Sequence, residues 1–134
     1  MARYSNTKAG VKRWQADIWF SQCVRLAADN KCERCRGEAS DCCHIYGRSK
    51  IVTRWSKDNA IALCRTCHNR FGTEPCEWTD FIDLRWPGRR DRLILKLRGY
   101  LKNTEDNRQL ISTHYNKEFR RMEKDGTRDF ESWN

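Results

Sequence analysis

Residues 32–71, CERCRGEASDCCHIYGRSKIVTRWSKDNAIALCRTCHNRF, decide the fold of this 134-residue chain. Two Cys-x-x-Cys pairs enclose the segment: Cys32 with Cys35, and Cys64 with Cys67. Two pairs at this spacing fit one tetrahedral zinc ion held by four thiolates. A closed thiolate site has no open position for a substrate, so the sequence predicts a structural Zn²⁺ that pins both ends of the segment.

The chain contains eight cysteines, a number that is also compatible with a disulfide framework. The N-terminal stretch MARYSNTKAGVKRW lacks the apolar core of a secretory signal, which argues against that reading. A thioredoxin-like redox protein would need one Cys-x-x-Cys beside a strand–helix unit and not two matched pairs. Cys23, Cys42 and Cys76 are expected to pack as small apolar residues, with Cys42 also close enough to the zinc unit to act as a substitute ligand.

The formal net charge is +9, and the basic residues are spread along the whole length of the chain. A surface of this kind suits a phosphate backbone, so DNA is the expected partner; the competing interpretation is a basic protein without such a partner. No apolar run approaches the ~20 residues that span a bilayer. A cytoplasmic protein with no membrane contact is therefore expected.

The sequence predicts an α+β fold, most simply one domain with three units. Residues 1–31 are expected to form a basic N-terminal helix, residues 32–77 a zinc-pinned ββα core, and residues 78–134 a helical extension. Apolar residues at three- and four-residue steps predict the first helix between Lys12 and Asn30.

Within the core, DCCHIYGR favours a strand, the β-branched KIVTRW favours a second strand or a loop, and RTCHNRF favours a helix that begins at Arg65. In the extension, EWTDFIDLRW and RRDRLILKLRGYL read as helices, and a last helix is expected between a Thr104 cap and Gly126. The tail 127–134 is expected to fray.

His44, Asn59 and His68 stand between or directly beside the two cysteine pairs, and they indicate phosphodiester hydrolysis. The attacking water needs a base, and His44 is suited because the pKa of histidine lies near neutrality. The developing charge on phosphorus and on the leaving oxygen needs a divalent cation as Lewis acid. His68 is placed to bind that metal, and Asn59 can hydrogen-bond across the turn and orient the base. The set favours a metal-dependent nuclease.

This ordered set resembles the motif of the HNH (ββα-metal) endonucleases in their four-cysteine zinc form. The text from CCHIYGR to RTCHNRF is especially similar to the NinG/Rap recombination nucleases of lambdoid phages. The resemblance implies His44 as general base, Asn59 as the orienting residue and His68 as a ligand of the catalytic metal. It also implies that Arg48 contacts a phosphate at the cut, with Arg54 and Trp55 supporting that loop and Arg54 counted among the DNA-binding residues.

The resemblance further implies an enzyme that hydrolyses DNA, with its substrate narrowed toward branched recombination intermediates such as Holliday junctions and D-loops. If phage-encoded, the protein would work in the host cytoplasm. Paired cuts across a junction would favour a homodimer, which the long C-terminal helices could form. The alternative is a non-catalytic, zinc-dependent nucleic-acid-binding module, which would have no need of His44, Asn59 and His68.

One position departs from the family pattern. Many HNH enzymes carry Asp or His immediately before the base, where it binds the metal, whereas this chain has Cys43. A thiolate is a poor ligand for Mg²⁺ and a good one for softer metals. Three interpretations stay open: Cys43 packs in the interior, Asp41 replaces it as ligand from the same face of the strand, or the catalytic metal is Mn²⁺ or another transition ion and not Mg²⁺.

Overall fold

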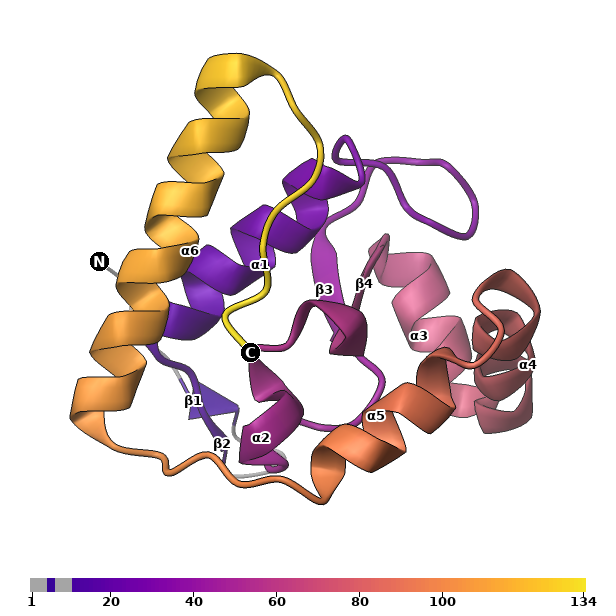
Figure 1. Cartoon of the computed structure of the whole chain (residues 1–134). Helices are drawn as coiled ribbons and strands as arrows, with labels where there is room; N and C mark the ends of the chain where they lie inside the picture. The colour runs from indigo at the N-terminus through magenta and orange to yellow at the C-terminus, as the bar shows by residue number, and fades with distance from the viewer. Residues whose placement is uncertain (1–4, 7–10) are drawn as a thin grey trace.

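The computed structural model describes residues 5–6 and 11–134 of the chain, and it has an α+β architecture (Figure 1). The rest of the predicted N-terminal unit, residues 1–4 and 7–10, lies outside the described part. The elements in chain order are β1 (Ser5–Asn6), β2 (Val11–Lys12), α1 (Gln15–Ala27), β3 (Asp41–His44), α2 (Ile51–Arg54), the 3₁₀ turn η1 (Lys57–Asn59), β4 (Ala60–Leu63), α3 (Arg65–Thr73), α4 (Pro75–Arg85), α5 (Arg89–Leu97) and α6 (Glu105–Asp125).

The central feature is the antiparallel pair β3–β4, which is buried between two helical layers. Its register places Cys43 opposite Ile61 and His44 opposite Ala60. Successive side chains of a strand point to opposite faces. On β4, Ala60 and Ala62 accordingly join the cluster under α1 and α6, whereas Ile61 and its neighbour Leu63 join a second cluster under α3 and α4. Small residues on the first face allow α1 to approach the strand closely.

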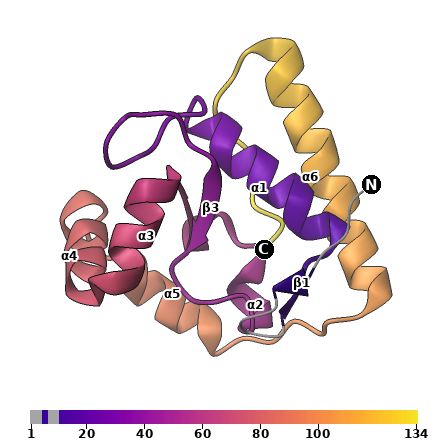
Figure 2. The same ribbon diagram turned by 180° about the vertical axis from the view of Figure 1, so that it is seen from behind.

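Helices α1 and α6 lie side by side on one face of this pair (Figures 1 and 2). The Thr104 hydroxyl accepts a hydrogen bond from the Asn107 N–H at the start of α6, and Gly126 ends the helix with a positive φ of 75°. Both ends agree with the sequence prediction. The Thr104 oxygen pairs a free N–H at the start of the helix, and the left-handed Gly126 lets the chain turn so that a free carbonyl at its end is paired. The helix predicted between Lys12 and Asn30 is confirmed as α1.

The second strand of the sheet is not the one that the sequence favoured. KIVTRW forms α2 instead, and residues 60–63 form the strand, with all four side chains buried. Strand propensity is weak against tertiary packing. Here a helical turn lets the side chains of Thr53 and Arg54 both enter the interior.

The C-terminal tail is also different from the expectation, because residues 127–134 pack and do not fray. Phe130 is 4% exposed and meets Phe20 and Tyr115 edge to face. The N–H of Trp133 donates to the Tyr115 hydroxyl at 2.9 Å, and the tail crosses toward α2 (Figure 1). Burying the aromatic ring against other aromatic rings gains more free energy than is lost when the terminal chain becomes ordered.

In the described residues, no helix is both long enough and apolar enough to cross a membrane. All eight cysteines lie in the described part, and none of them is joined in a disulfide.

Replacing Phe130 with alanine should lower the free energy of unfolding by about 3–5 kcal/mol, because it leaves a cavity between α1, α6 and the tail. Urea denaturation followed by circular dichroism would measure this. Tyr100→Ala, at a side chain that is 83% exposed, is the matched aromatic control and should change stability by less than about 0.5 kcal/mol. Equal effects of the two variants would mean that the tail contributes nothing to the core.

Candidate functional site

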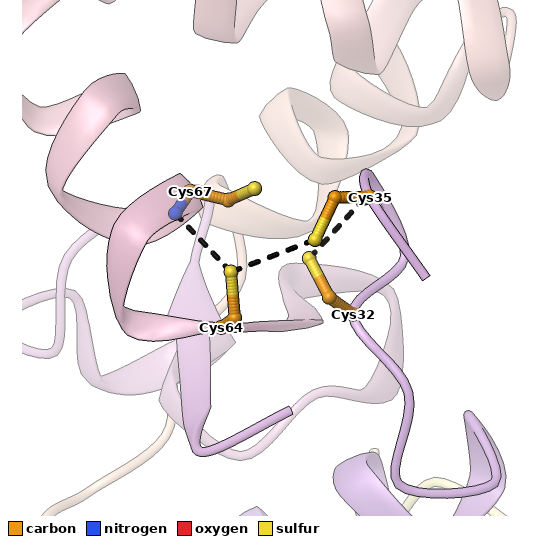
Figure 3. Close-up of side chains that lie close together, drawn as sticks. All are labelled: Cys32, Cys35, Cys64 and Cys67. Carbon is orange, nitrogen blue, oxygen red and sulfur yellow. Dashed lines mark hydrogen bonds between the residues drawn. The ribbon is translucent and has the colours of Figure 1, made fainter. Parts of the chain in front are cut away.

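Four cysteine side chains from two distant segments meet at one point (Figure 3). The sulfur atoms of Cys32, Cys35, Cys64 and Cys67 all lie within 4.8 Å of one another, and those of Cys35 and Cys64 are 3.7 Å apart. Zn–S bonds of about 2.3 Å in a tetrahedron would separate the sulfurs by about 3.8 Å. The donor set and its spacing therefore fit a structural metal ion such as zinc, as the sequence predicts.

Backbone N–H groups around the cluster favour ionised sulfur. The N–H of Cys35 points at the Cys32 sulfur at 3.5 Å, and the N–H of Cys67 points at the Cys64 sulfur at 3.3 Å. Burial opposes ionisation of Cys32, but hydrogen bonds from neighbouring backbone groups outweigh it and lower its pKa to about 6. Burial and the adjacent thiols raise the pKa of Cys67 to about 12.

The remaining cysteines do not join this cluster. Among the described residues, the four cysteines are the one group of three or more His, Cys, Asp or Glu side chains that can hold a metal, so Cys42 is not a substitute ligand. Cys23 is buried, as expected. Cys76 is exposed in the first turn of α4, and the prediction that it packs is wrong, because that turn faces solvent.

A Cys64→Ser or Cys67→Ser protein should lose its zinc and unfold, because structural zinc contributes roughly 10–16 kcal/mol of folding free energy in zinc-finger peptides. Metal content and circular dichroism would be measured together, with Cys76→Ser as the control at an exposed thiol. A folded Cys67→Ser protein without zinc would show that the cluster has no structural role.

An open cleft of about 720 Å³ is lined by residues of β3, α1 and α3, and it gathers most of the candidate site. Figure 2 shows these three elements next to one another. Its lining includes Asp41, Cys43, His44, Arg48 and His68, which come from β3, the loop after it and the first turn of α3. The structure thus brings the predicted base, the predicted metal ligands and one predicted phosphate-binding arginine to a single surface. Asn59 and Arg54 lie behind it.

His44 is held in one tautomer. Its Nε2 lies 3.0 Å from the backbone carbonyl of Arg54, and since a carbonyl oxygen only accepts, Nε2 carries the proton. In neutral imidazole the other nitrogen, Nδ1, then has the free lone pair. Burial lowers the pKa of His44 to about 4, so the ring is neutral at pH 7. A half-buried, neutral and oriented imidazole can accept a proton from water.

Asp41 and His68, which both line the cleft, contact each other directly. The Nδ1 of His68 is 2.7 Å from a carboxylate oxygen of Asp41, while Arg65 lies 3.2 Å from the other oxygen. With its Nδ1–H given to a carboxylate, His68 presents its Nε2 lone pair, the arrangement typical of metal-binding histidines. Asp41 is buried and His68 is 40% exposed, so one end of the pair is fixed while the other faces the cleft.

Cys43 turns into the apolar cluster under α3 and α4. It is 8% exposed and shares that cluster with Ile61 and Leu63, and burial together with the charge of Asp41 raises the pKa of its thiol to about 12. These observations favour the packing role for Cys43. Of the two residues considered as oxygen or sulfur ligand, Asp41 carries the oxygen atoms that Mg²⁺ prefers, but in this structure its carboxylate contacts His68 and Arg65.

Asn59 braces the loop that carries Arg48. Its side-chain oxygen accepts from the Tyr46 N–H at 2.8 Å, and its amide donates to the carbonyls of Tyr46 and Thr53 at 2.8 and 3.0 Å. The side chain is fully buried. Asn59 therefore spans both ends of the loop between β3 and α2 and makes the predicted cross-turn contact. Its predicted role in orienting His44 stays a prediction, because its side chain bonds to Tyr46 and Thr53.

The direct DNA contact predicted for Arg54 does not fit its position. Its side chain is 3% exposed and makes an ion pair with Asp17 at 2.7 Å. A guanidinium held in this way is not offered to a phosphate on the surface, so Arg54 fits the supporting role and not the binding role. Arg48, in contrast, lines the cleft.

One wall of the cleft is made of residues that the sequence did not predict as part of the site. Arg13, Asp17, Ser21 and Arg25 line it from α1 and the residue pair before it, and Arg65 lines it from α3. The first four recur at intervals of four residues, which is a polar stripe on one face of a helix. This four-residue spacing is visible in the sequence and is the signal that indicates the polar face of the helix.

Comparison with known proteins gave no match: no protein-family model, no curated protein and no solved structure is significantly similar to this chain.

Proposed function

We propose that this protein is a metal-dependent endonuclease of the HNH type that hydrolyses DNA phosphodiester bonds. The observation that carries the proposal is the convergence of His44, Asp41 and His68 on one cleft that is also lined by arginines, beside a four-cysteine cluster. A scaffold that only bound nucleic acid would need the arginines and the cluster, but not an oriented neutral histidine or a carboxylate–imidazole pair.

In this proposal His44 takes a proton from the attacking water. The Arg54 carbonyl holds its Nε2–H, so Nδ1 is the accepting atom. Arg48 and Arg65 line the same cleft and would stabilise the additional negative charge that develops on the phosphate.

His68 would bind the catalytic divalent metal, Mg²⁺ or Mn²⁺ or another transition ion, through its Nε2 atom, and Asp41 would orient the ring through Nδ1. The other coordination positions would be filled by water and substrate phosphate, as is common at Mg²⁺ sites. When bound, the metal would act as a Lewis acid on the phosphate and the leaving oxygen. Arg65 would share the charge of Asp41 and fix the orientation of its carboxylate.

The direct test is cleavage of supercoiled plasmid and of a synthetic four-way junction with Mg²⁺, Mn²⁺ or EDTA. Wild type should cut only with metal, and His44→Ala should lower the rate by about 10²–10⁴-fold, the usual contribution of a general base. His114→Ala, on α6 and outside the cleft lining, is the matched histidine control and should cut like wild type.

The ratio of junction to duplex cleavage tests the narrower expectation of a branched recombination substrate. A preference for the junction would support it, and equal rates would reduce the proposal to a general DNA endonuclease. No cutting with any metal, by a folded protein that retains zinc, would overturn the endonuclease and leave a zinc-dependent nucleic-acid-binding module.

Arg48→Ala should weaken DNA binding and lower the slope of log affinity against log salt by about 0.9, the value for one lost phosphate contact. Fluorescence anisotropy with labelled duplex at several salt concentrations would measure both. Arg120→Ala is the control, because Arg120 is an exposed arginine on α6 outside the cleft lining. An unchanged slope in Arg48→Ala, or an equal change in the control, would place the DNA elsewhere.

A further inference from the structure

A buried ion pair adjoins the cleft: Asp17 is one of the residues that line it, and Arg54 is not. The carboxylate of Asp17 accepts hydrogen bonds from Arg54 Nε at 2.9 Å and from Arg54 Nη2 at 2.7 Å. This bidentate contact fixes the plane of the guanidinium. The two side chains are 4% and 3% exposed. Removing two ions from water offsets most of their attraction, so such a pair is a poor source of net stability. Its position beside the cleft indicates that it holds the residues of the site in place.

Arg54 connects this pair to the two functional residues of the loop. Its backbone carbonyl accepts the Nε2–H of His44 at 3.0 Å. Its Nη1 donates to the backbone carbonyl of Arg48 at 3.4 Å. The same residue therefore fixes the predicted base through its main chain and the predicted phosphate-binding arginine through its side chain.

Asp17 supplies the fixed end of this connection. It lies in the first turn of α1, and its carboxylate also accepts from the Trp14 N–H at 2.7 Å, which ties it to the start of that helix. Helix α1 is in turn packed along α6, so the carboxylate stands on a rigid element. Sites that are supported from regular secondary structure hold their geometry better than sites supported from loops.

We propose that Asp17 is a positioning residue: by anchoring Arg54, it sets the tautomer and orientation of His44 and the path of the loop that carries Arg48. The catalytic consequence rests on the proposed endonuclease function, whereas the effect on the His44 ring does not. Without the carboxylate, the guanidinium would be a buried, unpaired charge. Arg54 would then leave the interior, and α2 with its carbonyl would shift, which frees His44 to rotate or to move its proton to Nδ1.

The test compares wild type with Asp17→Asn, which keeps the shape and the acceptor for Trp14 but removes the charge. The tautomer of His44 would be read from its imidazole ¹⁵N shifts in zinc-loaded protein without DNA. Wild type should show a single Nε2–H form, and Asp17→Asn should show a mixture of forms. In cleavage, kcat should fall about 10–100-fold, the scale of a small misplacement of a reacting group, with KM changed less than about threefold.

Asp129→Asn is the matched control, because Asp129 also pairs with a distant cation, Lys57, but on the surface and away from the cleft. It should leave both the tautomer and kcat unchanged. If Asp17→Asn does not fold, the double variant Asp17→Asn/Arg54→Gln removes both charges and leaves no unpaired ion. The backbone carbonyl of residue 54 remains in that variant, so its His44 tautomer and kcat report on positioning and not on folding.

A wild-type tautomer in Asp17→Asn or in the double variant overturns the inference, and so does a wild-type kcat. If wild type itself does not cut DNA, the endonuclease proposal fails, but the ¹⁵N measurement still decides whether Asp17 positions His44. A mixed tautomer supports the inference in that case as well.

Discussion

Four sulfur atoms within 4.8 Å of one another join two segments 29 residues apart, and the geometry of the cleft depends on that junction. The first pair precedes β3 and the second begins α3, so a metal ion such as zinc between them would fix where the strand starts and where the helix points. Asp41 follows the first pair and His68 follows the second. Their 2.7 Å contact exists because the cluster sets both elements at once.

The strand pair transmits this arrangement to the rest of the molecule. Ala60 and Ala62 admit α1 on one face, and Ile61 and Leu63 fill the space under α3 and α4 on the other. A sheet of two strands has little stability alone, and it persists here because both faces are covered. The covering helix α1 is also a wall of the cleft, so core packing and the candidate site share one element.

Polar side chains behind the cleft form a second set of constraints. Asn59 closes the loop between β3 and α2 with three hydrogen bonds, and Arg54 joins that loop to α1 through Asp17. Buried polar groups must be paired, and in a region of low dielectric constant each pairing has a defined geometry. The loop that carries Arg48 is therefore held at both ends from the interior, while His44 is held by the carbonyl of Arg54.

The sequence by itself determined the α+β class, the four-cysteine cluster, the bounds of α1 and α6 to within a few residues, and the residue types able to do the proposed chemistry. Each of these depends on local spacing: Cys-x-x-Cys pairs, apolar periodicity, or a cap such as Thr104. Only the tertiary structure decided that residues 60–63 and not KIVTRW make the second strand, that the tail packs around Phe130, and that Arg54 is buried against Asp17. These outcomes depend on contacts between residues far apart in the chain, and burial of a side chain against a distant partner outweighs the preferences of a short segment.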